Sequence, residues 1–253
     1  MIELQDVVVA YDERVILDHV NLTIQDGETL AVLGPSGAGK STVLRLIIGL
    51  QKPNSGRILV DGQDVTVMKE NEINLVREQM GMVFQYSALF DSMTVGENVA
   101  FGLRQHTHRS EEDIKNTVAR KLRMVGLTGL EDYMPSELSG GMKKRVGLAR
   151  AIALDPKVIL YDEPTSGLDP ITSGTISRLI RSMQRHLNCT SIVVTHDMNS
   201  AFFIGDRLAL LEEGKFVAVA PPEEFRNSPD DRVQQFIHGR KSVRKGDRQG
   251  EFI

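Results

Sequence analysis

The feature that most restricts the fold is a glycine-rich loop set between an apolar run and an amphipathic stretch. It follows the pattern G-x-x-x-x-G-K-[ST], and its residues are Gly34, Pro35, Ser36, Gly37, Ala38, Gly39, Lys40 and Ser41. Glycines let the backbone curl so that successive N–H groups point inward and form a nest for an anion. The positive end of a following helix would face the same place. The sequence therefore predicts a strand at residues 29–33, a phosphate-binding loop, and a helix at residues 40–50.

The loop also supplies side chains suited to a nucleoside triphosphate. Lys40 can reach the β- and γ-phosphates, and the Ser41 hydroxyl can bind Mg²⁺. We expect Thr42, the next residue, to contact the nucleotide as well.

Two adjacent carboxylates, Asp162 and Glu163, follow an apolar run at residues 158–161. Beside a phosphate loop, Asp162 could hold Mg²⁺ through water, and Glu163 could orient and deprotonate an attacking water. Two solvated acids at a strand end are the alternative, and the phosphate loop favours the first interpretation.

The order of apolar runs predicts the fold class. Strand-like runs occupy residues 3–10, 20–24, 29–33, 57–60, 81–84, 158–161, 191–195 and 207–211. Residues 94–153 are helical in character, with Ser110 as a helix N-cap, and another helix is expected at residues 171–187. Strands alternating with helices predict an α/β protein with a parallel-rich core and a helical insertion between its two halves.

Composition excludes several classes of protein. The 253 residues carry a net charge of −4, which argues against a dedicated nucleic-acid-binding protein. The lone cysteine, Cys189, excludes a disulfide within the chain and fits a reducing compartment. No apolar run approaches the roughly 18 to 20 residues that span a bilayer, and the acidic start does not resemble a secretory signal. We therefore expect a chain that does not enter a membrane by itself.

A second candidate anion site lies at Ser139, Gly140 and Gly141, directly before a helix expected at residues 142–153. Such a triplet alone is more often a helix-capping turn. With Leu138 before it and Met142 after it, the segment resembles the Leu-Ser-Gly-Gly-Gln signature of the ATP-binding-cassette (ABC) ATPases. Met142 stands where glutamine is usual, and the three residues that would face phosphate are unchanged.

The remaining motifs of that family follow in the family's order, over about residues 1–239. Tyr11 resembles the aromatic residue that stacks on adenine, although a core tyrosine is the alternative. Gln85 resembles the Q-loop glutamine, and Asp169, ending Ser-Gly-Leu-Asp, resembles the D-loop aspartate. His196 resembles the switch histidine, although a histidine at a strand end is more often structural.

The resemblance implies a P-loop NTPase fold of the ABC type. Its parts would be a RecA-like α/β core, an antiparallel β subdomain and a helical subdomain at about residues 87–155. It also implies a head-to-tail homodimer that binds ATP and Mg²⁺ between the subunits. One chain would supply the catalytic residues Lys40, Gln85, Glu163 and His196 and the metal ligands Ser41, Gln85 and Asp162. The other chain would supply Ser139, Gly140 and Gly141, with Asp169 bridging the two sites.

The segment after Gln85 is a candidate contact surface for a partner protein. In related transport ATPases this region receives a short coupling helix of a permease, which is our interpretation of Leu89, Phe90 and Met93; local core is the alternative. The amino-acid sequence of this segment, together with that of residues 97–101, resembles the Mla-type phospholipid-transport ATPases. That resemblance implies a separate permease, an MCE-domain lipid-binding partner, no nucleic acid, and a peripheral place on the cytoplasmic face of the inner membrane.

Three other functions stay open at this point. An importer ATPase for amino acids or another small solute would share the mechanism. A non-transport ABC protein would typically carry two cassettes or a long coiled-coil insertion, and neither occurs in this sequence. A signalling GTPase would show an Asn-Lys-x-Asp motif, which is absent. Residues 240–253 form a basic tail of net charge +3, which we interpret as solvated rather than as a docking arm.

Overall fold

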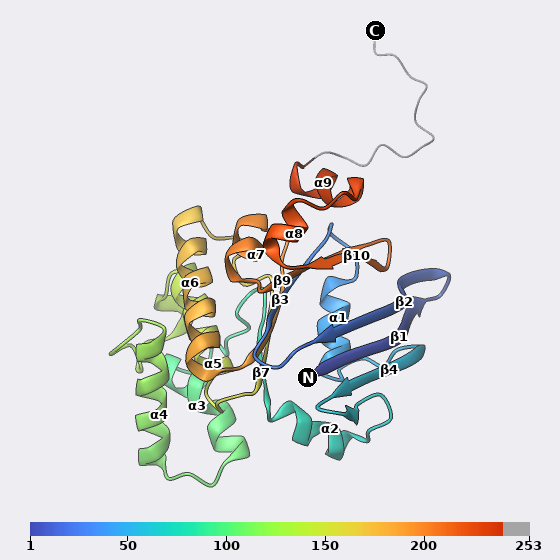
Figure 1. Ribbon diagram of the computed structural model, residues 1–253. Helices are drawn as coiled ribbons and strands as arrows, with labels where there is room; N and C mark the ends of the chain where they lie inside the picture. The colour runs from blue at the N-terminus through green and yellow to red at the C-terminus, as the bar shows by residue number, and fades with distance from the viewer. Residues whose placement is uncertain (240–253) are drawn as a thin grey trace.

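The computed structural model describes residues 1–239, which form two sheets and a set of helices, with the smaller sheet, which contains β1, β2 and β4, at one side of the molecule (Figure 1). The strands are β1 (Ile2–Tyr11), β2 (Arg14–Ile24), β3 (Thr29–Leu33), β4 (Ser55–Val60), β5 (Gln63–Asp64), β6 (Met80–Val83), β7 (Val158–Asp162), β8 (Thr190–Val194), β9 (Arg207–Glu212) and β10 (Lys215–Ala220). The helices are α1 (Lys40–Ile47), α2 (Glu70–Arg77), α3 (Val95–His106), α4 (Glu111–Met124), η1 (Pro135–Glu137), α5 (Gly140–Ala151), α6 (Pro170–Leu187), α7 (Met198–Ile204), α8 (Pro222–Arg226) and α9 (Asp231–Ile237).

The larger sheet has the strand order β10-β9-β3-β8-β7-β6. Strands β9, β3, β8, β7 and β6 are parallel to their neighbours, and only β10 runs antiparallel. The carboxyl ends of parallel strands meet at one edge of a sheet, where open α/β folds bind ligands. The chain leaves that edge after β3, β6, β7 and β8 through the loops that carry Gly34, Gln85, Glu163 and His196.

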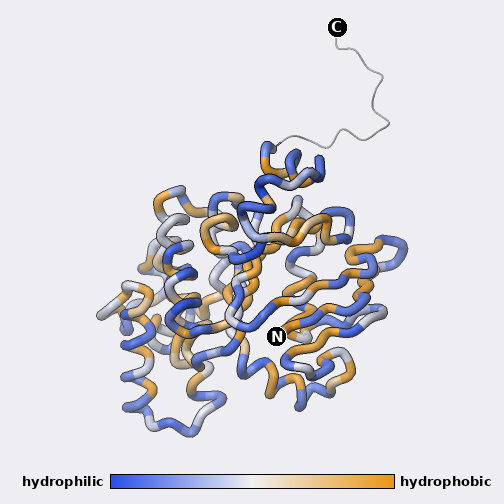
Figure 2. Tube along the Cα trace, in the orientation of Figure 1, coloured by the Kyte–Doolittle hydropathy of each residue, from blue (hydrophilic) through white to orange (hydrophobic). Residues whose placement is uncertain are grey.

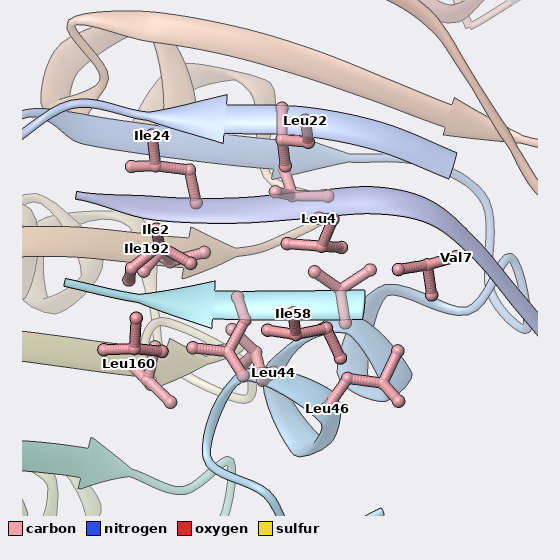
Figure 3. Close-up of a cluster of buried hydrophobic side chains, with 14 of the residues drawn as sticks. Ile2, Leu4, Val7, Leu22, Ile24, Leu44, Leu46, Ile58, Leu160 and Ile192 are labelled. Atoms are coloured by element: carbon pink, nitrogen blue, oxygen red, sulfur yellow. The ribbon is translucent and has the colours of Figure 1, made fainter. Parts of the chain in front are cut away.

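The smaller sheet, with the order β2-β1-β4-β5, is antiparallel throughout. Its inner face packs on α1 and on the larger sheet, as Figure 3 shows for Ile2, Leu4, Leu44, Ile58 and Leu160. Figure 2 shows hydrophobic segments concentrated along the strands of both sheets. This shared core holds the end of β1, and therefore Tyr11, beside the loop that precedes α1.

The chain between β6 and β7 is helical, as the sequence predicted. Helix α3 packs on α4 and α5, and a second buried cluster joins Val99, Leu122 and Val146 to Ile159 of β7. The predicted cap of α4 is confirmed, because the Ser110 hydroxyl accepts a hydrogen bond from Asp113 N at 3.1 Å. The helix thus begins where its exposed N–H groups gain a partner.

Several elements differ from the prediction. Strand β2 begins at Arg14 rather than at residue 20, and α2, α7, β5, β10, α8 and α9 were not predicted. The weak signal of α2 has a physical cause: only Ile73 and Val76 of its residues are buried. The helix expected at residues 142–153 begins two residues earlier, because Ser139 is its N-cap. Residues 240–253, the predicted basic tail, lie outside the described residues. Among residues 1–239, every helix is too short or too polar to cross a bilayer.

Leu44 of α1 should be a large contributor to stability, because its side chain is fully buried in the core between the two sheets. We expect Leu44→Ala to lower the free energy of unfolding by about 2–5 kcal/mol, since it leaves a cavity. Leu75→Ala on α2 is the matched control: Leu75 is 63% exposed, and its loss should cost less than about 0.5 kcal/mol. Urea titrations without nucleotide measure both, and equal losses would contradict the assignment.

Candidate functional site

The glycines of the loop are required by close backbone approach. Gly34 has φ 154°, and a Cβ there would lie 2.2 Å from Leu211 O. Gly39 has φ 99°, and its Cβ would lie 3.0 Å from Ile16 Cγ2. A side chain at either position would displace a neighbouring strand, so the loop can pass between β2 and β9 only with glycine there.

Lys40, the first residue of α1, folds back over this loop. It is 8% exposed, and its Nζ donates hydrogen bonds to Gly34 O at 2.9 Å and Pro35 O at 3.1 Å. Glu163 Oε1 lies 4.0 Å from the same nitrogen. Burial, the larger influence, lowers the pKa of Lys40, and the negative charges of Glu163 and Asp162 oppose that shift. The loop therefore encloses a cation.

The structure brings the two predicted oxygen ligands of a metal together. Ser41 Oγ donates a hydrogen bond to Asp162 Oδ1 at 2.9 Å, across 121 positions of the chain. Gln85, the third predicted ligand, donates from Nε2 to Ser166 Oγ at 3.3 Å instead. Within residues 1–239 no cluster of three histidine, cysteine or carboxylate side chains could hold a metal ion alone. Any ion at Ser41 and Asp162 would need oxygens from water or a ligand.

Glu163 has a strained backbone and a held side chain. Its φ is 48°, a left-handed conformation that costs a non-glycine residue on the order of 1–3 kcal/mol. Its N–H donates to Val194 O at 2.9 Å, which fixes the turn after β7 on the neighbouring strand β8. Its Oε2 lies 2.8 Å from His196 Nδ1. Sequence reasoning predicted both residues but not this contact.

These side chains surround one open cavity of about 450 Å³. The predicted residues that line it are Tyr11, Ser36, Gly37, Gly39, Lys40, Ser41, Thr42, Gln85, Glu163 and His196. Tyr11 is 50% exposed, so the interpretation of Tyr11 as core is wrong. Arg14, Ile16 and Arg45 also line the cavity and were missed. Arg45 could have been noticed as a positive charge close to the phosphate loop in sequence, whereas Arg14 lies on strand β2, distant from the loop in sequence.

The second candidate anion site lies apart from this cavity in the same chain. Ser139 is the N-cap of α5, and its hydroxyl accepts from Met142 N at 3.3 Å. Asp169 is the N-cap of α6 and accepts from Ile171 N and Thr172 N, each at 3.0 Å. Ser139, Gly140, Gly141 and Asp169 are absent from the described lining of the Lys40 cavity. Within one chain, the two candidate anion-binding segments are therefore separate.

Helix α5 contacts the site through a lysine that sequence reasoning missed. Lys144 is 6% exposed, and its Nζ donates to Gln85 O and to Glu163 O, the latter at 3.5 Å. Burial lowers the pKa of Lys144, and the charge of Glu163 opposes this. The available sequence signal for a buried Lys144 was its place two positions before the apolar Val146 in the same helix.

The segment after Gln85 is also held by α5. Ser87 and Ala88 have φ of 63° and 46°, and Arg150 donates to their carbonyls at 2.7 and 2.6 Å. Leu89 packs on the second core. Phe90 is exposed, with its ring 4.8 Å from that of Phe101. Of the predicted coupling residues, Leu89 is thus partly core.

Met93, the third predicted coupling residue, lines a hollow of about 200 Å³ with Glu97, Phe101, Arg104 and Gln105 of α3. Phe90 and Met93 therefore both lie on the surface beside α3.

Comparison with known proteins agrees with this geometry. The family model described as ABC transporter matches residues 17–166. MlaF of Haemophilus influenzae, an intermembrane phospholipid transport system ATP-binding protein, is 46% identical over 239 residues, or 94% of this chain and 90% of the relative. The probable ribonucleotide transport ATP-binding protein mkl of Mycobacterium tuberculosis is 42% identical over 240 residues, or 95% of this chain and 67% of the relative.

A solved structure shows the same fold. The dimeric post-hydrolysis state of the ATP-binding cassette MJ0796, bound to ADP and Pi, superposes with a TM-score of 0.81 at 34% identity, covering 88% of this chain and 99% of that one. The predicted cassette fold is confirmed. The chain therefore belongs to the ABC transporter family and is one of its ATP-binding cassettes, an enzyme that hydrolyses ATP.

Proposed function

We propose that this chain is the ATP-hydrolysing subunit of a transporter that moves phospholipid between membranes. The observation that carries the proposal is the cavity at the sheet edge, where Lys40, Ser41 and Glu163 converge, in a chain 46% identical to MlaF over 90% of that protein. Residues 1–239 would form one nucleotide-binding domain, with its helical subdomain at about residues 87–155.

The cavity offers a distinct place for each part of ATP. Tyr11 stacks on adenine at the rim, and the N–H groups of the loop and the ammonium of Lys40 bind the phosphates. On binding, Lys40 exchanges the carbonyls of Gly34 and Pro35 for phosphate oxygens. Its positive charge then stabilises the charge that develops on the transferred phosphoryl group.

The oxygen donors present fit Mg²⁺. This ion prefers oxygen ligands and keeps waters and substrate phosphates around it rather than an all-protein cage. Ser41 and Asp162, whose oxygens lie 2.9 Å apart, would hold it directly or through water, with Gln85 as a third ligand. When bound, the ion neutralises charge on the β- and γ-phosphates.

Glu163 acts as the general base. Its carboxylate lies on the cavity wall and accepts a proton from the attacking water. The water oxygen then bonds to the γ-phosphorus, the bond between that phosphorus and the β–γ bridging oxygen breaks, and ADP and phosphate are released. His196 Nδ1, 2.8 Å from Glu163 Oε2, holds the carboxylate in position and gives the γ-phosphate a hydrogen-bonding neighbour. Lys144 fixes the backbones of Gln85 and Glu163 and is a positioning residue.

A head-to-tail homodimer completes each site. In one chain Ser139, Gly140 and Gly141 do not line the Lys40 cavity, so a second copy supplies them across the interface. The helix end at Ser139 then closes on the γ-phosphate, and Asp169 bridges the two sites. The solved structure of the relative MJ0796 is itself described as dimeric.

The partners follow from the same assignment. A permease receives the closing motion at the surface of Leu89, Phe90 and Met93, and an MCE-domain protein carries the lipid. The chain then sits on the cytoplasmic face of the inner membrane. No nucleic acid is involved, in keeping with the net charge of −4.

Ribonucleotide transport is a second candidate, favoured by the 42% identity to mkl. Purifying the intact complex and identifying its subunits and bound molecules by mass spectrometry separates the two. We expect an MCE-domain subunit and phospholipid. A complex that holds ribonucleotide other than at the ATP site, or a periplasmic binding protein for amino acids, would overturn the lipid assignment but not the ATPase.

Glu163→Gln should stop turnover and preserve binding, because it removes the base and keeps the shape. We expect hydrolysis to fall by roughly 10²–10⁴-fold, with ATP trapped in a closed dimer visible by size-exclusion chromatography. Glu224→Gln, at an exposed position of α8, is the control and should behave as wild type. Turnover within a few-fold of wild type in Glu163→Gln would remove Glu163 from this role.

Lys40→Ala should weaken nucleotide binding itself. A hydrogen bond to a charged group contributes about 1.5–3 kcal/mol, so the Kd for ATP should rise at least about tenfold, as measured with a fluorescent analogue. Lys52→Ala removes an exposed lysine and should leave the Kd unchanged. An unaltered Kd in Lys40→Ala would contradict the phosphate contact.

Lys144→Met should separate catalysis from binding. Lys144 contacts only backbone carbonyls of the site, so we expect kcat to fall by roughly 10–100-fold, as misplaced catalytic groups do, while the Kd for ATP stays unchanged. Lys144→Arg keeps a donor and should restore part of kcat. Parallel loss of binding, or no rescue by arginine, would indicate a purely structural role.

A further inference from the structure

A basic groove runs along α6 and reaches α7, outside the cavity that binds ATP. It is a shallow, open depression of about 470 Å³, and its lining residues are Arg178, Arg181, Ser182, Arg185, His186 and Phe203. Five of the six come from α6 at spacings of three and four residues, which places them on one face of the helix. We call this surface the arginine groove. No carboxylate lines it within the part of the chain that the structure describes.

Two of its arginines lack a structural task. Arg181 donates from Nη1 to Asp206 Oδ1 and Ile204 O, each at 2.8 Å, and so ties α6 to the turn after α7. Arg178 donates only to Thr175 Oγ1 on its own helix, at 3.1 Å. Among residues 1–239, neither Arg178 nor Arg185 forms an ion pair. Arg178 and Arg185 therefore make this surface locally positive, although the net charge of the whole chain is −4.

An exposed aromatic ring stands beside these charges. Phe203 is 53% exposed, whereas Ala201 and Ile204 of the same helix are buried. The apolar side of α7 therefore faces the core and leaves Phe203 outside it. Arginine and aromatic side chains together are the composition of the energetically dominant part of protein interfaces.

We propose that the arginine groove docks an acidic segment of a partner protein distinct from the permease. The partner places an apolar side chain on Phe203 and carboxylates on Arg178 and Arg185, where forked guanidinium–carboxylate hydrogen bonds can form. The two arginines are seven residues apart, or roughly 10 Å along the helix. A partner helix with two carboxylates about seven residues apart matches that spacing.

The charge and shape of the groove favour protein over other polyanions. A chain of net charge −4 repels nucleic acid at long range, and the lining offers no lysine. The groove is shallow but small, with six lining residues and one aromatic anchor, whereas an acidic bilayer would call for an extended basic face.

The position of the groove gives docking a consequence. Helix α6 begins directly after Asp169, and α7 begins two residues after His196. Arg178 and Phe203 also line a neighbouring hollow of about 590 Å³ that His196 and Ser166 share. A seated partner therefore contacts both helices that follow the catalytic loops. The docking itself does not depend on which molecule is transported.

Photo-cross-linking from position 203 tests the proposal. Phe203 is replaced by p-benzoyl-phenylalanine in the full chain, the intact complex is irradiated in native membranes, and the attached segment is sequenced by mass spectrometry. We expect a segment of another protein with at least two carboxylates and an apolar residue. A synthetic peptide of that segment should bind the purified chain.

The double variant Arg178→Glu/Arg185→Glu should weaken peptide binding by more than tenfold, and exchanging the two carboxylates of the peptide for lysine should restore it. The matched control, Lys115→Glu/Arg120→Glu on the exposed face of α4, makes the same charge change and should bind as wild type. Unchanged thermal unfolding shows that both variants are folded.

In the cross-linking experiment, the proposal is overturned by a cross-link to a second copy of this chain, to lipid, to nucleic acid or to a segment without carboxylates, and also by no cross-link. In the binding experiment, it is overturned by peptide binding that survives the double variant or by an equal loss of binding in the control. A cross-link to a second copy would assign the groove to the dimer, and a lipid cross-link would assign it to the membrane surface.

Discussion

The rest of the site depends on the interactions of the buried Lys40 ammonium with the groups around it. The N-terminus of α1 concentrates positive potential, and Lys40, its first residue, adds a full charge to the same place. In the absence of a ligand, that charge is held by two loop carbonyls and by Glu163 at 4.0 Å. The carboxylate that we propose to activate water thus also offsets the charge that we propose to bind phosphate.

This balance requires strands distant in sequence to end side by side. Parallel pairing sets β3, β8 and β7 in register, with Val32 opposite Val194 and Val194 opposite Asp162. A slip in either pairing would move Asp162 away from Ser41. The fully buried aliphatic faces of these strands fix the register, because a shifted strand would expose them. The hydrophobic core therefore sets the electrostatic geometry.

Sequence reasoning identified the parts of the site that are contiguous in the chain. Residues 34–41, the pair Asp162 and Glu163, and the cap at Ser110 each carry their own local pattern. Ser41 and Asp162 were each predicted as metal ligands, and the parallel strands β3, β8 and β7 bring the two side chains together at one edge of the sheet. Lys144 could not be placed this way, because its two acceptors are backbone carbonyls, and a carbonyl leaves no trace in a sequence. The same holds for Arg150, whose acceptors are the carbonyls of Ser87 and Ala88. Strand β10 and helix α9 were missed for another reason, since they are stabilised by tertiary packing.

The left-handed backbone of Glu163 restricts which residues the position can accept. Asparagine and aspartate adopt this conformation more readily than glutamate does, so aspartate would relieve part of the strain and keep a carboxylate. Its side chain is one methylene shorter, however, and would withdraw from His196 and from Lys40. At this residue a lower backbone strain and a longer side chain therefore cannot be obtained together. The protein has glutamate, the residue with the longer side chain. The stability of the fold is correspondingly lower than its packing alone would allow, and in return the Glu163 carboxylate is held beside His196 and Lys40.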